Sequence, residues 1–322
     1  MTYDEMNNFI LNYIKNDITG RAIMLTGEWG SGKSYYIKNT LKPFLEDKDN
    51  GKYKCVIISL YGLSDISEIS QAIYTELRTI KKEIDTELSN TTKVVGKIVC
   101  KTIFNGLVSK IGFDIGKIKG LDFQKIYESV DLTNKLIIFE DIERTKIDVI
   151  ELLGYINNMC ENDGVKVLLI TNESELLTTY EKTDDQGKTT KYYTDSALAY
   201  KRAKEKTIGD TIYFVCDYEN TIQHIIKSFG IFLQKYSSPE CAADIRDIFV
   251  LMSSHNLRAF IYCCQKFKEI LMFLDDNSIP VKDEIQKMLF YGSVAFTQRQ
   301  SQGANLQFER DIVNPLYKRT KM

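Results

Sequence analysis

Eight consecutive residues have the types and spacing needed to bind a phosphate group. Residues 27–34, with the sequence GEWGSGKS, match the pattern G-x-x-x-x-G-K-[ST] at every fixed position. The N–H groups of such a glycine loop, together with the start of the following helix, point partial positive charge at one anion. We expect Lys33 to reach the β- and γ-phosphates and Ser34 to hold Mg²⁺. The predicted nucleotide-binding residues are Gly27, Trp29, Gly30, Ser31, Gly32, Lys33, Ser34 and Tyr35.

Two adjacent carboxylates follow an apolar run further along the chain. Residues 136–139 (LIIF) are typical of a buried strand, and Glu140 and Asp141 come directly after it. Ligands of open α/β sheets bind at the carboxyl ends of the strands, and triphosphate hydrolysis needs Mg²⁺ and an oriented water molecule. We predict that Glu140 coordinates Mg²⁺ through water and that Asp141 polarises the attacking water, although the two roles could be exchanged. An ordinary acidic turn is the alternative interpretation.

A polar amide and several cations complete the set of candidate catalytic residues. Asn172 follows the next apolar strand, so it could orient the attacking water or cap the turn that begins at Glu173. Arg258 stands near the start of a predicted helix and could contact the γ-phosphate. A surface ion pair is the more common arrangement for such an arginine. Arg144 could pair with Glu140 or Glu143 or face a neighbouring subunit. The weaker candidates are Lys204 and Lys206.

The nucleotide is predicted to be ATP rather than GTP. Guanine-specific proteins use an Asn-Lys-x-Asp box, whereas Asn134-Lys135 is followed here by Leu136-Ile137 and has no aspartate.

Alternating strands and helices must position these residues. The predicted strands are residues 22–26, 56–60, 136–139, 165–170 and 211–215, and the predicted helices are 3–16, 35–45, 66–84 and 148–160. This order predicts an α/β fold with a parallel sheet between two layers of helices. The polar residues 181–195 are predicted to form a mobile loop. The pattern becomes helical beyond residue 217, so we expect an NTPase domain over 1–216 and a helical lid or partner subdomain over 217–322.

A basic amphipathic segment interrupts the predicted NTPase domain at residues 92–120. Lys93, Lys97 and Lys101 recur at every fourth position, opposite an apolar stripe. This pattern is typical of a solvated helix packed on a core, and it also suits a helix that contacts a membrane surface or a protein partner.

Composition restricts the class of protein. The chain has 322 residues and a net charge of −2, which argues against a broad nucleic-acid interface. Its seven cysteines include no C-x-x-C pair, so we expect buried, reduced thiols in a cytoplasmic protein. Neither a signal peptide nor an uncharged run long enough to span a bilayer is visible.

The motifs taken together resemble the KAP family of P-loop NTPases. The resemblance spans about residues 20–265 and is carried by GEWGSGKS, by IIFEDIER (137–144) and by the Asn256-Leu257-Arg258 block. It implies an AAA-like fold of the STAND group, with an extra strand between the P-loop strand and the acidic strand. The first and third acids of the family's acidic motif correspond to Glu140 and Glu143. The resemblance also suggests a bacterial, anti-phage setting.

These observations predict a Mg²⁺-dependent ATPase that works as a molecular switch and acts on a protein partner or through self-association. The alternative is a nucleotide-gated binding or oligomerisation module with negligible turnover. A small-molecule kinase is disfavoured because the sequence has no obvious acceptor-binding lid motif.

Overall fold

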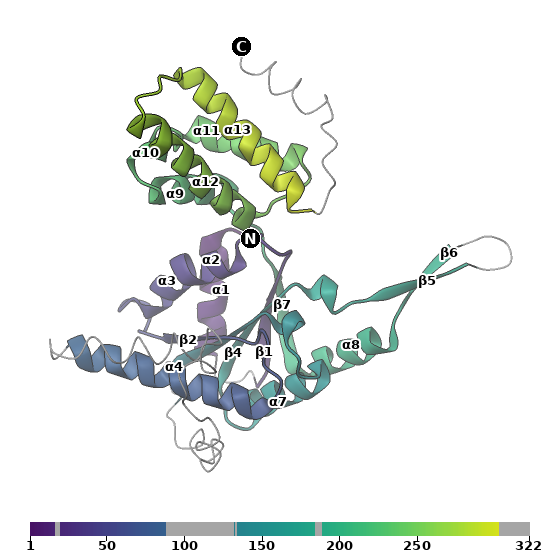
Figure 1. Cartoon of the computed structure of the whole chain (residues 1–322). Coiled ribbons are helices and arrows are strands. Elements are labelled where there is room, and N and C mark those ends of the chain that lie inside the picture. The colour runs from purple at the N-terminus through teal and green to yellow at the C-terminus, as the bar shows by residue number, and fades with distance from the viewer. Residues whose placement is uncertain (17–19, 88–131, 133, 184–188, 303–322) are drawn as a thin grey trace, which may run out of the picture. The chain divides into compact units, whose positions relative to one another are not determined.

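The chain forms two compact units. The structure is a computed structural model that describes residues 1–16, 20–87, 132, 134–183 and 189–302 (Figure 1). The helical unit contains Met1–Tyr3, Glu28–Tyr35 and the described residues from Phe214 onward, and the sheet unit contains Asp4–Gly27 and the described part of Tyr36–Tyr213. The domain boundary predicted after residue 216 stays a prediction. The predicted basic segment 92–120 lies outside the described residues.

A five-stranded parallel sheet forms the centre of the sheet unit. Its strands are β1 (Ala22–Thr26), β2 (Lys54–Ser59), β3 (Lys135–Glu140), β4 (Lys166–Thr171) and β7 (Ile208–Tyr213). Their order across the sheet is β2-β3-β4-β1-β7. Strand β4 therefore lies between the P-loop strand and the acidic strand, which confirms the predicted extra strand. Strand β7 begins three residues before the predicted range 211–215.

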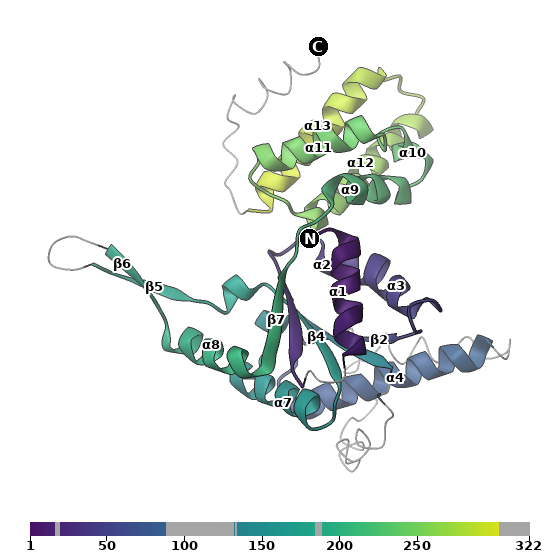
Figure 2. The same ribbon diagram turned by 180° about the vertical axis from the view of Figure 1, so that it is seen from behind.

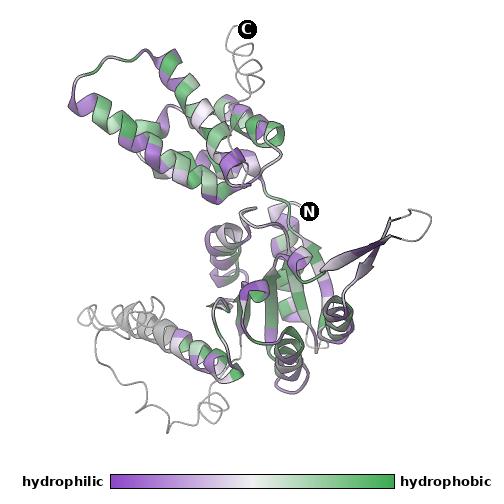
Figure 3. Ribbon diagram, turned by 45° about the vertical axis from the view of Figure 1, so that its right-hand side comes forward, coloured by the Kyte–Doolittle hydropathy of each residue, from purple (hydrophilic) through white to green (hydrophobic). Residues whose placement is uncertain are grey.

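Helices cover both faces of this sheet, because the central strands are apolar on both sides. The longer described helices of the sheet unit are α1 (Tyr3–Lys15), α4 (Ile66–Glu87), α7 (Val149–Glu161) and α8 (Asp195–Thr207). Residues of α4, α7 and α8 share one hydrophobic cluster with Met24 and Phe139 from the sheet. Figure 2 shows α1 in front of the opposite face. The central strands are largely hydrophobic in Figure 3, and the predicted three-layer fold is confirmed.

The helix after the P-loop contains a π-helical turn. It runs through α2 (Lys33–Tyr36), the π turn (Ile37–Leu41) and α3 (Lys42–Glu46). Lys42 N–H donates to the carbonyl of Ile37, five residues earlier. Pro43, which has no N–H to donate, follows directly. The predicted helix 35–45 is confirmed, whereas the sequence pattern did not indicate the π turn.

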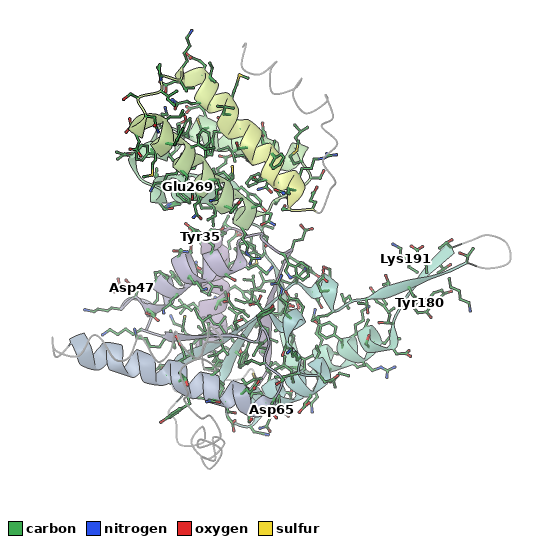
Figure 4. The ribbon with its side chains drawn as sticks, in the orientation of Figure 1. Tyr35, Asp47, Asp65, Tyr180, Lys191 and Glu269 are labelled. Atoms are coloured by element: carbon green, nitrogen blue, oxygen red, sulfur yellow. The ribbon has the colours of Figure 1, made fainter. Side chains whose placement is uncertain are left out.

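The prediction of a mobile loop over 181–195 was wrong for residues 181–183 and 189–195, and residues 184–188 lie outside the described residues. Strands β5 (Thr179–Thr183) and β6 (Thr189–Tyr193) form an antiparallel hairpin in which Tyr180 pairs with Tyr192. The two tyrosine rings stack with their centroids 5.8 Å apart. All residues of both strands are exposed, and Tyr180 and Lys191 are labelled on the hairpin in Figure 4. Threonine and tyrosine favour extended backbone, so cross-strand pairing outweighs the polarity that suggested a loop.

The helical unit confirms the predicted helical character of the chain beyond residue 217. Its helices are α9 (Tyr218–Ser228), α10 (Ile231–Gln234), α11 (Pro239–Leu251), α12 (Leu257–Asp276) and α13 (Asp283–Gln300). Aromatic residues fill its centre, where the ring of Phe290 contacts those of Phe260 and Phe267. None of the helices in the described part of the chain is both long enough and apolar enough to cross a lipid bilayer.

Candidate functional site

Three predicted site segments leave the same edge of the sheet. Strands β1, β3 and β4 are parallel, with Thr26 level with Thr171 on the neighbouring strand, and Glu140 level with Ile170. Gly27 opens the phosphate loop at this edge and donates its N–H to the Thr171 carbonyl at 3.2 Å. The topology thus brings the start of the loop, the acidic pair and Asn172 to the carboxyl ends of adjacent strands, where ligands of open α/β sheets bind.

Glu140 is a buried carboxylate with an unsatisfied oxygen. The residue is only 6% exposed, and its Oε1 has no hydrogen-bond partner among the residues that the structure describes. Its Oε2 lies 3.9 Å from Nζ of Lys38. A cavity of about 550 Å³ is lined by Glu140, Ser59 and Lys38, among others. A buried, unpartnered oxygen costs free energy, so this group is suited to a ligand that supplies positive charge or donors.

Asp141 is held in an uncommon backbone conformation. Its φ of 61° and ψ of 39° lie in the left-handed region, which aspartate tolerates better than most residues. The hydroxyl of Ser59 donates to Oδ2 at 2.9 Å, and Arg144 N–H donates to the Asp141 carbonyl at 3.0 Å. Sequence reasoning missed Ser59. Its place in an apolar strand next to the acidic strand was the only available signal.

The third acid of the motif joins two strand ends. Glu143 lies in a short 3₁₀ turn (Ile142–Arg144), and its Oε2 accepts a hydrogen bond from the Thr171 hydroxyl at 2.9 Å. This bond links the segment after β3 to the end of β4. Glu143 is therefore a structural partner of β4 in this arrangement.

Asn172 does not cap the following turn with its side chain. The turn Glu173–Glu175 begins after Asn172, but no backbone N–H donates to the amide oxygen. That oxygen accepts instead from the Ser174 hydroxyl at 2.7 Å, and the residue is 7% exposed. The helix-cap interpretation of the Asn172 side chain was therefore wrong, because its amide oxygen accepts from a neighbouring hydroxyl and from no backbone N–H of the turn. The water-orienting role stays a prediction.

Lys204 is accounted for by an ion pair. Its Nζ lies 2.6 Å from Oε1 of Glu173, which also accepts from the Tyr200 hydroxyl at 3.1 Å. Glu173 N–H in turn donates to the Thr26 hydroxyl at the end of the P-loop strand. In this structure Lys204 therefore takes part in an ion pair, which is a common arrangement for a lysine near the surface.

The phosphate loop from Glu28 onward belongs to the helical unit. Gly30 and Gly32 have φ angles of 75° and 102°, which residues other than glycine rarely adopt. Lys33 is buried, and its Nζ donates to the Glu28 carbonyl at 2.7 Å. The Ser31 hydroxyl is also buried and has no partner among the described residues. The loop thus carries an ammonium group and an unsatisfied polar group, as an anion site requires.

The remaining predicted loop residues differ in exposure. Ser34 is exposed, and Trp29 is 44% exposed. Burial raises the pKa of Tyr35, which is labelled in Figure 4. Their binding roles stay predictions.

The N-terminus of α12 is hydrogen-bonded to the phosphate loop within the helical unit. Leu257 N–H donates to the Gly30 carbonyl at 2.8 Å. The side chain of Asn256 caps α12 by accepting from the N–H groups of Arg258 and Ala259, both at 3.1 Å. Arg258 is exposed. Sequence reasoning selected Arg258 but missed the contact with Gly30, because no spacing rule joins residues so far apart in the chain.

Tyr3 packs beside the same loop. Its hydroxyl lies 3.5 Å from Sγ of Cys216 and accepts from Asp217 N–H at 3.3 Å, and its ring stacks on Phe214. Burial raises the pKa of this tyrosine. The side chains of Phe214 and Cys216 therefore lie beside Gly32 of the phosphate loop.

Sequence comparison decides the family. The model of the KAP family P-loop domain matches residues 3–212, well over half of the chain. The chain belongs to the KAP family of P-loop NTPases. The KAP domain contains the phosphate loop, the acidic pair and Asn172, which confirms the resemblance found from the motifs. No curated protein matches the chain in sequence.

Two solved structures are similar to this KAP protein in fold. Domain III of the replication initiation protein DnaA from Thermotoga maritima is 12% identical, with 91% of this chain and 92% of that chain covered and a TM-score of 0.39. PCH-2 from C. elegans is 14% identical, with 94% and 70% covered and a TM-score of 0.39.

Proposed function

We propose that this KAP protein is a Mg²⁺-dependent switch that binds and hydrolyses ATP. The observation that carries the proposal is the edge of the sheet, where the start of the phosphate loop, Glu140, Asp141 and Asn172 follow adjacent parallel strands. Family membership supports nucleotide binding in general. ATP in particular is favoured by the missing guanine-recognition box after Asn134.

The side chains divide the proposed work between binding and chemistry. Lys33 binds the β- and γ-phosphates, and the Ser34 hydroxyl and Glu140 hold Mg²⁺. Mg²⁺, when bound, neutralises charge on the phosphates. The buried, unpartnered Oε1 of Glu140 supports this assignment, since a cation shell would satisfy it. Asp141 polarises the attacking water, and its bond to Ser59 supports a fixed orientation for the carboxylate.

The chain alone does not supply a complete metal shell in this proposal. Among the described residues, no group of three or more acidic, histidine or cysteine side chains is placed to hold a metal ion. Mg²⁺ commonly uses one or two protein oxygens together with waters and phosphate oxygens. The ion is therefore expected to bind with the nucleotide rather than before it.

The switching part of the proposal concerns the helical unit. The bond between Leu257 and Gly30 supports coupling between nucleotide in the loop and α12, with Arg258 near the γ-phosphate. The output is contact with a protein partner or with a second copy. A bacterial anti-phage setting is part of the same proposal and is suggested by the family resemblance, while the cytoplasmic location is suggested by the expected reduced thiols.

Two substitutions test the proposal. We expect Lys33→Ala to abolish ATP binding measured by calorimetry, while Lys48→Ala, at an exposed lysine, binds normally. We expect Asp141→Ala to bind ATP but to release phosphate at least ~100-fold more slowly. Full ATP affinity in Lys33→Ala would end the proposal, and an unchanged rate in Asp141→Ala would remove Asp141 from the mechanism.

The alternative is a nucleotide-gated oligomerisation module with negligible turnover. Lys33, Ser34 and Glu140 keep their binding roles in this alternative, whereas Asp141 has none. Phosphate release and molecular mass, measured on one sample with and without ATP, separate the two functions. A mass change without phosphate release favours the alternative.

A further inference from the structure

Residues at and just after the C-terminal end of α13 are hydrogen-bonded to the loop that precedes α12. This loop, residues 252–256, connects α11 to α12 and includes Ser253 in a left-handed conformation. Gln302 donates its amide N–H groups to the carbonyls of Met252 and Ser253 at 3.2 and 2.6 Å. Gln302, just after α13, therefore holds this short loop through two of its carbonyl groups.

Gln298 makes the most complete of these contacts. The residue is 0% exposed. Its Oε1 accepts from Asn256 N–H at 3.0 Å and from the Ser254 hydroxyl at 2.8 Å, and its Nε2 donates to the Asn256 carbonyl at 2.9 Å. One amide side chain thus satisfies both backbone groups of Asn256. A buried amide with this many bonds fixes the orientation of the residue that it holds.

Asn256 is connected to the phosphate loop through the first residue of α12. Its side chain caps α12, and the first N–H of α12, that of Leu257, donates to the Gly30 carbonyl. The approach is close, since a Cβ atom added to Gly30 would lie 2.4 Å from Oδ1 of Asn256. A shift of Asn256 would therefore reach Gly30 directly, either as a clash or as the loss of the Leu257 bond.

We propose that Gln298 is a positioning residue for the phosphate loop. It holds Asn256 so that the N-terminus of α12 keeps Gly30 in the conformation that receives phosphate. The effect on nucleotide rests on the proposed function, namely that the loop binds ATP. The effect on the loop itself does not depend on that function, because every bond in the series joins residues of this chain to one another.

Hydrogen exchange in the ATP-free protein tests the first step. Gln298→Met keeps the length of the side chain but removes the three hydrogen bonds. We expect amide exchange in residues 28–35 and at Leu257 to become about tenfold faster, because opening of the loop costs less free energy. Exchange in α9 should not change. Gln300→Met, at an exposed position on the same helix, is the matched control and should behave as the original protein.

ATP affinity tests the second step. We expect Gln298→Met to weaken ATP binding roughly tenfold, with Gln300→Met unchanged. If the unsubstituted protein binds no ATP, the proposed function fails, while the exchange experiment still decides the role of Gln298. Unchanged exchange at Leu257 and the loop, or equal acceleration in every peptide of the helical unit, would overturn the proposal, since the latter describes simple destabilisation.

A second variant covers the case in which Gln298→Met does not fold. Gln298→Glu keeps both acceptor contacts but replaces the Nε2 donor with a carboxylate oxygen that faces the Asn256 carbonyl. A neutral carboxyl regains a donor, so we expect ATP affinity relative to the unsubstituted protein to recover as the pH falls from 8 to about 5. A ratio independent of pH would contradict the positioning role.

Discussion

Adjacent carboxylates at the end of β3 have different environments. Glu140 is buried with one oxygen unsatisfied, whereas Asp141 is held by the Ser59 hydroxyl in a left-handed backbone. The strand ends at Glu140, and Asp141 follows it outside the strand conformation. This difference supports a division of roles, with Glu140 for the metal and Asp141 for the water.

The Ser59 bond leads to a kinetic prediction. Ser59→Ala removes the donor that orients Asp141, so we expect phosphate release to slow by about tenfold while ATP affinity is retained. Ser59→Thr keeps a hydroxyl and is expected to retain most of the rate. Equal rates in both variants and the original protein would show that the bond does not position the carboxylate.

The buried carboxylate leads to a prediction about stability and metal. Glu140→Gln removes a charge that is 94% buried and keeps the shape of the side chain. We expect the ATP-free protein to become more stable by about 1 kcal/mol and the Mg²⁺ dependence of ATP affinity to decrease. Thermal unfolding and calorimetry at several Mg²⁺ concentrations measure the two effects. Lower stability with unchanged Mg²⁺ dependence would argue that Glu140 is only structural.

At the scale of single elements, the phosphate loop depends on a glycine that its motif leaves free. The pattern G-x-x-x-x-G-K-[ST] requires Gly27 and Gly32 but permits any residue at position 30. The structure favours glycine at position 30 for two reasons. Its φ is 75°, and Asn256 approaches it closely enough to clash with a Cβ atom. The contact with α12 therefore restricts the loop more than phosphate binding does.

Gly30→Ala tests this restriction. We expect it to destabilise the helical unit by about 1–3 kcal/mol and to weaken ATP binding, because alanine is strained at positive φ and clashes with Asn256. Gly292→Ala is the matched control in α13, where an added Cβ meets no atom within 4 Å. It should leave stability equal or raise it by up to ~1 kcal/mol. A harmless Gly30→Ala would contradict the packing between the loop and α12.

The hairpin β5–β6 is an element with little connection to the core. Every residue of its strands is exposed, and Thr178 and Thr194 join its base through hydroxyls 2.6 Å apart. We expect replacement of residues 179–193 by a short Gly-Ser linker to leave the melting temperature within a few degrees. A large drop would show that the hairpin stabilises the sheet unit.

At the scale of the whole molecule, buried thiols connect stability to pH. The six described cysteines are free and buried, as predicted, and Cys100 lies outside the described residues. Burial raises the pKa of Cys55, Cys160 and Cys263 to about 12 in each case. The reference pKa of these thiols is 9.0, so the unfolded chain releases their protons first.

The sign of this difference gives a measurable trend. A folded-state pKa above the unfolded value means that stability is fully present below about pH 9 and is lost as the pH rises toward 12. We expect urea unfolding to show decreasing stability between pH 8 and pH 10, and Cys55→Ala to have a shallower slope than the original protein. Slopes are compared because alanine also leaves a cavity. Identical slopes would exclude a contribution from Cys55.

The sequence by itself determined the elements and the chemistry that sits at their ends. Apolar periodicity identified the central strands, and the glycine motif and the Glu140–Asp141 pair were visible as local patterns. These features could be predicted because they depend on residues that are near one another in the chain. The hairpin was missed because polar composition says little about cross-strand pairing.

Only the tertiary structure decided which distant groups meet. The bond of Ser59 to Asp141, the pairing of Glu143 with Thr171 and the contact of Gln298 with Asn256 join residues 28 to 82 positions apart. Leu257 reaches Gly30 across an even longer stretch. No spacing rule encodes such pairs, because their geometry arises from the order of strands in the sheet and the packing of the helices, and both are settled by burial over the whole chain.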